Sequence, residues 1–472
     1  MAQTFFFYDL ETSGLNPRQD RIMQFAGQRT DMDLEPIGEP YNLLVTLNDD
    51  TLPSPDALMV TGITPQKTVE EGYTEAQFAR MLSEEIFTPD TIAVGFNNIR
   101  FDDEFIRHLL WRNFHDPYEW SWKDGRSRWD LLDVVRLTRA LRPEGINWPL
   151  DAKGEPSNRL ELITSANSIA HENAHDALAD VTALIAVTKL IKQKQPQLYN
   201  YLLKMRDKKV VQQLVNVDDK KPFVYASGRY DKEFAKTTVA FPLTTSRNGG
   251  VVVYDLRYDP TPFVELSTEE LSKKIFASWE ERQAEDFVKL PVKELQYNRC
   301  PAVAPLGVLE QGDGWQKISL DLKTVQKHQN ILLNHPDFAE KLRTIFENKP
   351  AFKKLPDPEA QLYDGFLNDR DRIRVEAVRN ADERELADFH PEFQDERLAP
   401  LLLHYKARNF PRSLSEDDLV QWEAWRAQHL QAQLPQFMAS LQRLAPTATG
   451  EQQFILQELQ LWAESVLPVV DS

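Results

Sequence analysis

The stretch FFFYDLETSG, residues 5–14, is an apolar run that ends in two carboxylates, Asp9 and Glu11, with one residue between them. Alternate residues of a β-strand lie on the same face, so both carboxylates share a face at the end of a predicted strand. Adjacent carboxylates resist ionisation unless a cation lies between them, and a divalent metal is the usual cation. Alone the pair is weak evidence, because strand ends often carry solvated acids.

Two further acidic segments resemble this one in their setting. VGFNNIRFDDEF, residues 94–105, places Asp102 after an apolar run and at the start of a helical pattern. NAHDALADVTAL, residues 173–184, places His175 and Asp180 five positions apart at the start of another helical pattern. Acids in a first helical turn also complement the helix dipole, and a single histidine is often structural. Asp180 is harder to explain in this way, because its neighbours are small and apolar.

The apolar pattern divides the chain into three predicted domains. Residues 1–196 alternate β-type runs with helical patterns, which indicates an α/β domain with a mixed sheet. Residues 197–350 carry shorter β-type runs and predict a small β-rich domain. Residues 351–472 show apolar residues at helical spacing. In this part Ser413, with Glu416 three positions later, predicts a capping box that opens a long helix.

Length and composition limit the classes of protein. A chain of 472 residues predicts two to four domains, at about 100 to 200 residues each. The single cysteine, Cys300, excludes an intrachain disulfide and a cysteine-rich zinc site, so any metal is held by oxygen or imidazole. A reducing, cytoplasmic compartment fits this composition. No apolar run reaches the roughly 18 residues that a membrane span requires, and the N-terminus lacks the pattern of a signal peptide.

The net charge of −18 argues at face value against a polyanionic partner, although the middle part of the chain is the least acidic. Binding of a single nucleic-acid strand requires aromatic faces for stacking and a cationic track for the backbone. Five tryptophans and six arginines alternate in one window: Trp111, Trp120, Trp122, Trp129 and Trp148, with Arg107, Arg112, Arg126, Arg128, Arg136 and Arg142. This density indicates a strand-binding groove, and about half of the tryptophans are assigned to ordinary core packing.

In order and local context, the three acidic segments resemble the D-x-E, N-x-x-[FY]-D and H-x(4)-D motifs of the DEDDh 3′-to-5′ exonuclease superfamily. The segments SRWDLLDVVRLTRALRPEGINWP, PSNRLELIT and YKARNFP narrow the resemblance to bacterial exonuclease I, and it extends over nearly the whole chain. The resemblance implies a ribonuclease-H-like α/β exonuclease domain, whose mixed sheet is flanked by helices. It also implies that an SH3-like β-rich domain comes next along the chain and that an all-helical C-terminal domain comes last.

The resemblance also implies an activity. It is the magnesium-dependent 3′-to-5′ hydrolysis of single-stranded DNA to nucleoside 5′-monophosphates, processive and used in DNA repair and recombination. Two Mg²⁺ ions, with Mn²⁺ as a substitute, suit a group of carboxylates with open positions. The implied metal ligands are Asp9, Glu11, Asp102 and Asp180, and the implied general base is His175.

Substrate contacts and partners follow from the same resemblance. The residues implied to contact the strand are Glu11, Arg107, Tyr118, Trp122, Arg136, Arg142 and Arg159. The implied partner is the acidic C-terminal tail of single-stranded DNA-binding protein, and the implied oligomeric state is a monomer. Two alternatives stay open: a DEDDh exoribonuclease or proofreading subunit, and a catalytically silent single-strand-binding scaffold.

Overall fold

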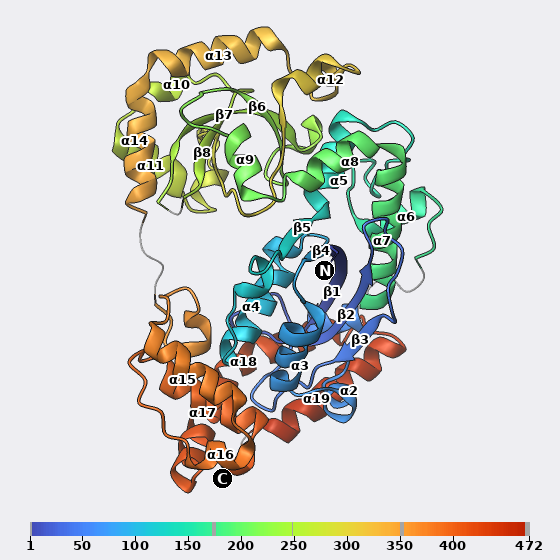
Figure 1. Ribbon diagram of the computed structural model, residues 1–472, viewed down its shortest axis with the longest axis vertical. Helices are drawn as coiled ribbons and strands as arrows, with labels where there is room; N and C mark the ends of the chain where they lie inside the picture. The colour runs from blue at the N-terminus through green and yellow to red at the C-terminus, as the bar shows by residue number, and fades with distance from the viewer. Residues whose placement is uncertain (1, 172–175, 248, 350–353, 468–472) are drawn as a thin grey trace. The chain divides into compact units, whose positions relative to one another are not determined.

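The computed structural model describes residues 2–171, 176–247, 249–349 and 354–467 (Figure 1). These residues form two compact units, each built from separate stretches of the chain. The first unit holds the described parts of Met1–Ser127, His171–Ile185 and Lys353–Ser472, and the second those of Arg128–Ala170 and Ala186–Phe352. The units therefore do not follow chain order, and the boundaries at residues 196 and 350 stay predictions.

The first unit contains a five-stranded mixed sheet in the order β3-β2-β1-β4-β5. Its strands are β1 (Thr4–Thr12), β2 (Ile22–Thr30), β3 (Tyr41–Leu44), β4 (Thr91–Gly95) and β5 (Ser127–Asp130), the last of which leads into the second unit. Strand β1 pairs antiparallel with β2 and parallel with β4, which confirms the predicted mixed sheet.

Alternation along β1 separates its two faces. Phe6, Tyr8 and Leu10 join a buried core to which α3 (Glu75–Met81) and α4 (Asp102–Arg112) also contribute. Because successive strand residues point to opposite faces, Asp9 and Glu11 lie on the other face. The packing of the apolar face thus fixes where the two carboxylates point.

Helices from the C-terminal part of the chain complete the first unit, which confirms the predicted all-helical region. Leu430 and Leu459 pack with Leu52 and Leu58, and Leu401 packs with Trp111. The helices of this unit besides α3 and α4 are α1 (Pro55–Thr61), α2 (Pro65–Glu71), η1 (Leu82–Ile86), η2 (Asn98–Arg100), η3 (Glu119–Ser121), the start of α7 (Ala177–Lys194), η7 (Pro358–Gln361), α15 (Asp369–Asn380), α16 (Glu383–Asp388), α17 (Leu398–Asn409), η8 (Pro411–Ser413), α18 (Glu416–Leu444) and α19 (Glu451–Val466).

The predicted capping box of the long helix α18 is wrong by two residues. Ser415 is the N-cap: its Oγ accepts from Asp418 N at 3.1 Å, and Ser415 N donates to Asp418 Oδ2 at 3.1 Å. Ser413 ends the preceding turn η8, and its Oγ donates to Phe410 O at 2.7 Å. The Ser413 hydroxyl is therefore already hydrogen-bonded within the preceding turn and does not cap α18.

The second unit contains an antiparallel sheet in the order β10-β6-β7-β8-β9, which confirms the predicted β-rich region. Its strands are β6 (Phe223–Ala226), β7 (Thr237–Thr245), β8 (Val251–Asp255), β9 (Val292–Leu295) and β10 (Ala302–Pro305). Its helices are α5 (Leu131–Leu141), α6 (Leu160–Ala166), the later part of α7, α8 (Pro196–Lys204), α9 (Lys208–Leu214), η4 (Lys232–Phe234), α10 (Thr261–Val264), α11 (Thr268–Phe276), η5 (Glu281–Gln283), η6 (Leu306–Glu310), α12 (Gly314–Lys317), α13 (Leu322–Asn334) and α14 (Pro336–Glu347). Val211, Phe223 and Val253 are part of its core.

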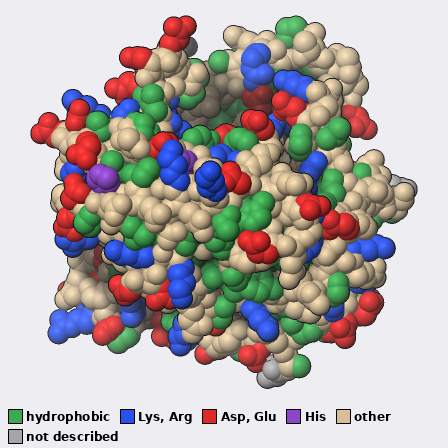
Figure 2. All heavy atoms as spheres, turned by 90° about the horizontal axis from the view of Figure 1, so that it is seen from above, with side chains coloured by type: hydrophobic (Ala, Val, Ile, Leu, Met, Phe, Trp, Pro, Cys, Tyr) green, Lys and Arg blue, Asp and Glu red, His purple; other side chains and the backbone are tan. Residues whose placement is uncertain are grey.

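Among the described helices, none combines the length and apolar character needed to cross a bilayer. On the face shown in Figure 2, acidic and basic side chains are intermixed. The negative net charge is thus not gathered into one acidic surface on that face.

Candidate active site

Asp9 and Glu11 lie at the C-terminal end of β1, opposite Ala26 and Gln24 of β2. The pairing register shifts between Glu11 and Thr12, which marks a bulge or irregularity. Such irregularities change the direction in which a side chain points and are common next to functional sites. Both carboxylates are half-buried, so they face neither bulk water nor the apolar core.

Asp102 reaches the same edge of the sheet because β1 and β4 are parallel. The turn after β4 is tight, since a Cβ on Gly95 would lie 2.5 Å from Asn98 Cβ. Asn98 is fully buried, and its Nδ2 donates to Asp103 Oδ1 at 3.2 Å and to Tyr8 Oη at 3.3 Å. Tyr8 also donates to Asp103. Asp103 therefore ties the start of α4 to β1 and places its neighbour Asp102 near Asp9.

Asp180 lies in the first turn of α7, and its side chain is 19% exposed. Its Oδ1 is 2.6 Å from Nε2 of His171, whose side chain is nearly buried. Asp176 accepts backbone hydrogen bonds from residues 178 and 179 at 3.1 Å and so begins the helix. His175, the predicted general base, lies outside the described residues. His171 was not predicted, although it precedes the same helix by only a few residues.

The structure brings three of the predicted metal ligands together. One carboxylate oxygen from each of Asp9, Glu11 and Asp180 lies within 4.8 Å of the others. Burial, followed by the charges of Asp102, Glu11 and Asp180, raises the pKa of Asp9 well above its usual value. Burial, followed by Asp180 and Asp102, raises the pKa of Glu11 to about 8.

After burial, the charges of the neighbouring carboxylates contribute to these raised pKa values, so the ionised groups repel one another. A divalent cation among them would remove this repulsion, and oxygen ligands with open positions suit a hard ion such as Mg²⁺. The donor set therefore fits the metal centre that the sequence predicts, with Asp102 as the fourth carboxylate beside the three.

A cluster of aromatic side chains lies in the same unit. The Arg107 guanidinium is 5.6 Å from the centre of the Tyr118 ring, and that ring is 6.4 Å from Tyr363 and 6.1 Å from Phe366. Tyr363 is 47% exposed, Phe366 84% and Trp122 64%. Exposed aromatic faces beside a cation are typical of single-strand binding surfaces.

Four of the predicted strand-contacting residues are thus in the unit that holds the carboxylates: Glu11, Arg107, Tyr118 and Trp122. Tyr363 and Phe366 were not predicted. Trp111, Trp120 and Trp129 are buried, so for them the packing explanation is confirmed.

The other three predicted contacts, Arg136, Arg142 and Arg159, belong to the second unit. Arg136 forms an ion pair with Asp133 at 2.5 Å, with its side chain 15% exposed. Arg142 donates to backbone and side-chain oxygens, including Leu141 O at 2.7 Å. The Arg159 side chain is 74% exposed, and its Nη1 lies 3.9 Å from Glu161 Oε1.

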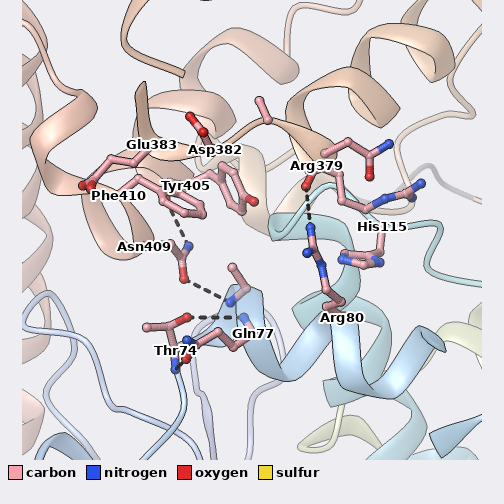
Figure 3. Close-up of a pocket in the computed structure, with 13 residues that line it drawn as sticks. Thr74, Gln77, Arg80, His115, Arg379, Asp382, Glu383, Tyr405, Asn409 and Phe410 are labelled. Carbon is pink, nitrogen blue, oxygen red and sulfur yellow. Dashed lines mark hydrogen bonds between the residues drawn. The ribbon is translucent and has the colours of Figure 1, made fainter. Parts of the chain in front are cut away.

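A cavity of about 360 Å³ lies elsewhere in the first unit (Figure 3). It is lined by Arg80 and Arg379 and by His115, whose pKa burial and these two arginines lower to about 3. Arg80 donates to the backbone oxygen of Arg379 at 3.2 Å. None of the predicted site residues lines this cavity, so the candidate chemistry lies with the carboxylates.

Three family models match the chain. The exonuclease family matches residues 6–188, the exonuclease I SH3-like domain matches residues 206–348, and the exonuclease I C-terminal domain matches residues 356–466. Exodeoxyribonuclease I of Haemophilus influenzae is 41% identical over 444 residues, covering 93% of each chain. Exodeoxyribonuclease I of Escherichia coli is 40% identical over 437 residues, covering 92% of this chain and 91% of the relative.

Solved structures of exonuclease I are similar to the chain over nearly its whole length. A moderately thermophilic Exonuclease I from Methylocaldum szegediense has a TM-score of 0.94 at 40% identity, covering 99% of this chain and all of that one. E. coli Exonuclease I in complex with a dA16 oligonucleotide has a TM-score of 0.93 at 38% identity, covering 98% and 100%. The zinc-bound form of the E. coli ExoI–ssDNA complex has a TM-score of 0.94 at 38% identity, covering 99% and 100%.

Proposed function

Because the chain belongs to the exonuclease I family, we propose that it hydrolyses single-stranded DNA from the 3′ end and releases nucleoside 5′-monophosphates. The observation that carries this proposal is the convergence of Asp9, Glu11 and Asp180, with Asp102 beside them. The E. coli relative solved with a dA16 oligonucleotide supports the choice of substrate.

The carboxylates of Asp9, Glu11, Asp102 and Asp180 would hold two Mg²⁺ ions. Bound Mg²⁺ supplies activation of water, neutralisation of phosphate charge and stabilisation of the leaving 3′ oxygen. That a zinc-bound form of the E. coli complex exists supports a divalent ion in this family, and magnesium as the working ion is our proposal.

Two histidines would complete the site. His171 contacts Asp180 at 2.6 Å and would fix the orientation of that carboxylate, as hydrogen-bond partners of metal ligands do. We propose His175, on the family motif, as the general base that takes the proton from the attacking water.

The substrate strand would lie on the aromatic cluster formed by Tyr118, Tyr363 and Phe366, with bases stacked on the exposed rings. Arg107 and Trp122 would contact the same strand. Arg136, Arg142 and Arg159 are proposed as further contacts on the resemblance alone, with Arg159 the most exposed of the three.

The partner and cellular setting are proposed on family membership. A solved complex described as SSB/Exonuclease I with the inhibitor CFAM has a TM-score of 0.89 to this chain. It supports single-stranded DNA-binding protein as the partner, and we propose on the family resemblance that the partner binds through its acidic C-terminal tail. We further propose a processive cytoplasmic monomer that acts in DNA repair and recombination.

The test compares a 5′-labelled single-stranded DNA, its duplex and a matched RNA, with and without Mg²⁺. We expect a ladder that shortens from the 3′ end only on single-stranded DNA with Mg²⁺. Asp180→Asn should lower the rate by about 10³-fold or more, because the proposed metal centre would lose one of its carboxylate ligands. Asp369→Asn, at a 96% exposed side chain, is the matched control and should keep wild-type activity.

Two outcomes would overturn the proposal. Cutting of RNA in preference to DNA would place the chain with the exoribonucleases. Strand binding without cutting by the wild type would leave the scaffold alternative.

A further inference from the structure

Seven charged or imidazole side chains form a buried ion cluster in the first unit. They are Arg21, Asp50, Glu75, Arg112, Glu359, His404 and Arg408, and each side chain is at most 3% exposed. The first four come from the exonuclease region of the chain and the last three from its C-terminal region. Buried charges are costly unless they are paired, so this cluster needs an explanation.

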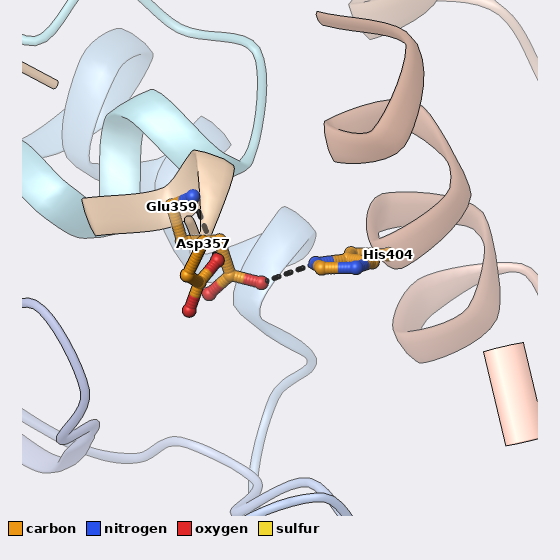
Figure 4. Close-up of side chains that lie close together, drawn as sticks. All are labelled: Asp357, Glu359 and His404. Carbon is orange, nitrogen blue, oxygen red and sulfur yellow. Dashed lines mark hydrogen bonds and ion pairs between the residues drawn. The ribbon is translucent and has the colours of Figure 1, made fainter. Parts of the chain in front are cut away.

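A metal site is not that explanation. Ligand atoms of Asp357, Glu359 and His404 lie within 4.8 Å of one another (Figure 4). However, Glu359 Oε1 is already 2.5 Å from Arg408 Nη1 and 2.8 Å from His404 Nδ1, and its Oε2 is 2.9 Å from Arg21 Nη2. Two permanently charged guanidinium groups would repel a divalent cation at this point.

Glu359 is instead the common partner of two arginines. Burial alone would raise its pKa, but Arg408 and Arg21 hold the pKa of Glu359 well below its usual value. Among the described residues, the second acid near Arg21 Nη2 is Asp50, whose Oδ2 lies farther away, at 3.7 Å. Arg21 Nε and Nη1 are buried and have no hydrogen-bond partner among the described residues. The Arg21 guanidinium thus has Glu359 as its main charge partner.

Arg21 in turn holds the loop that follows the catalytic strand β1. Ser13 N donates to Arg21 O at 2.8 Å, and Arg21 N donates to Ser13 Oγ at 2.8 Å. Ser13 lies two residues after Glu11, just past the register shift at Glu11 and Thr12. A displacement of Arg21 would therefore move Ser13, and with it the end of β1 that carries Glu11.

The segment around Glu359 also contacts α4, which begins with Asp102. Trp111 Nε1 donates to Pro358 O at 3.0 Å, and Tyr363 Oη donates to Glu104 Oε2 at 2.5 Å. One C-terminal segment thus contacts α4, which carries Asp102, and Arg21, which is bonded to the end of β1.

We propose that Glu359 is a positioning residue for the active site: through Arg21 it fixes the end of β1 and the position of the Glu11 carboxylate. The C-terminal region is then part of the active-site framework. This inference rests on the proposed function, because it concerns the same carboxylates. Positioning matters because a displacement of about 1 Å can cost about 100-fold in rate.

The test uses Glu359→Gln, which keeps the side-chain shape and removes the charge. The matched control is Arg443→Gln. It breaks the ion pair of Arg443 with Asp56 at 2.5 Å, which likewise joins the two regions but is about half exposed. For each full-length variant, kcat and KM on single-stranded DNA and the Kd for Mn²⁺ by calorimetry are measured, with thermal unfolding as the check on folding.

We expect Glu359→Gln to lower kcat by about tenfold or more and to weaken Mn²⁺ binding by about tenfold, with KM changed by less than about threefold. Arg443→Gln should leave all three within about twofold. A folded Glu359→Gln protein with wild-type kcat and Mn²⁺ affinity would overturn the inference.

If Glu359→Gln does not fold, Glu359→Asp keeps the charge at a greater distance from Arg21, and the same two criteria apply to it. A wild type that binds Mn²⁺ but does not cut DNA would contradict the proposed function. In that case the Mn²⁺ affinities of the variants would still decide the positioning role.

Discussion

Among single residues, Glu11 is, with Asp9, a carboxyl that must lose a proton if it is to bind a cation. Burial and the neighbouring acids raise its pKa from 4.5 to about 8, so the metal-free folded protein keeps a proton that the unfolded chain loses. This carboxyl therefore makes the metal-free fold less stable as the pH rises from 4.5 toward 8. A bound cation would require the ionised form of Glu11 and would offset this loss of stability.

We accordingly expect Mn²⁺ affinity to fall about tenfold for each pH unit below about 8, because a proton must leave Glu11 on binding. Calorimetry at about pH 6.5, 7.5 and 8.5 measures this. Glu11→Gln should bind Mn²⁺ more weakly and lose the part of the pH dependence that comes from Glu11, whereas Asp369→Asn should keep the full dependence. An affinity that does not change over this range would contradict the assignment of Glu11 as a ligand.

At the scale of an element, the residue at which a helix begins depends on hydrogen bonds that the spacing of residues in the sequence specifies only in part. Ser413 with Glu416 and Ser415 with Asp418 present the same three-residue spacing, and only the hydrogen bonds show that Ser415 opens α18. Ser415→Ala should lower the free energy of unfolding by about 1 kcal/mol, because the first amides of the helix lose an acceptor.

Urea denaturation followed by circular dichroism measures this loss. Ser415→Asp keeps a capping oxygen and should stay within about 0.5 kcal/mol of wild type. Equal losses in the two variants would show that Ser415 stabilises the protein in some other way.

The pair Asp9 and Glu11 could be predicted because the strand period of two places both on one face, and Asp102 because a helix follows a neighbouring strand. Tyr363 could not, because it contacts Glu104 from 259 positions away and its own neighbours show no pattern. The contact of His171 with Asp180 joins residues nine positions apart, a spacing that neither a helical turn nor the strand period brings together. Pairs across such distances come from tertiary packing, which local periodicity does not encode.

For the whole molecule, the proposed function gives the C-terminal region a part of the strand-binding surface, because Phe366 lies beside Tyr118. Phe366 is 84% exposed beside Tyr118, so Phe366→Ala should weaken binding of a dT oligonucleotide by about 1 to 3 kcal/mol without lowering thermal stability. Fluorescence anisotropy without Mg²⁺ measures this binding.

Phe454→Ala is the matched control, since Phe454 is a 57% exposed phenylalanine on α19. It should bind the oligonucleotide as wild type does. If both variants bind like wild type, the aromatic cluster is not the strand-binding surface.

The buried ion cluster also governs when a newly made chain can work. Arg408 and its partner Asp50 are 358 residues apart, so a ribosome that adds about 5 to 20 residues per second needs about 20 to 70 s between them. During that interval Arg21 and Asp50 have been synthesised without Glu359 or Arg408. A nascent chain therefore cannot form this ion cluster, or the support that we propose for β1, until residue 408 has been made.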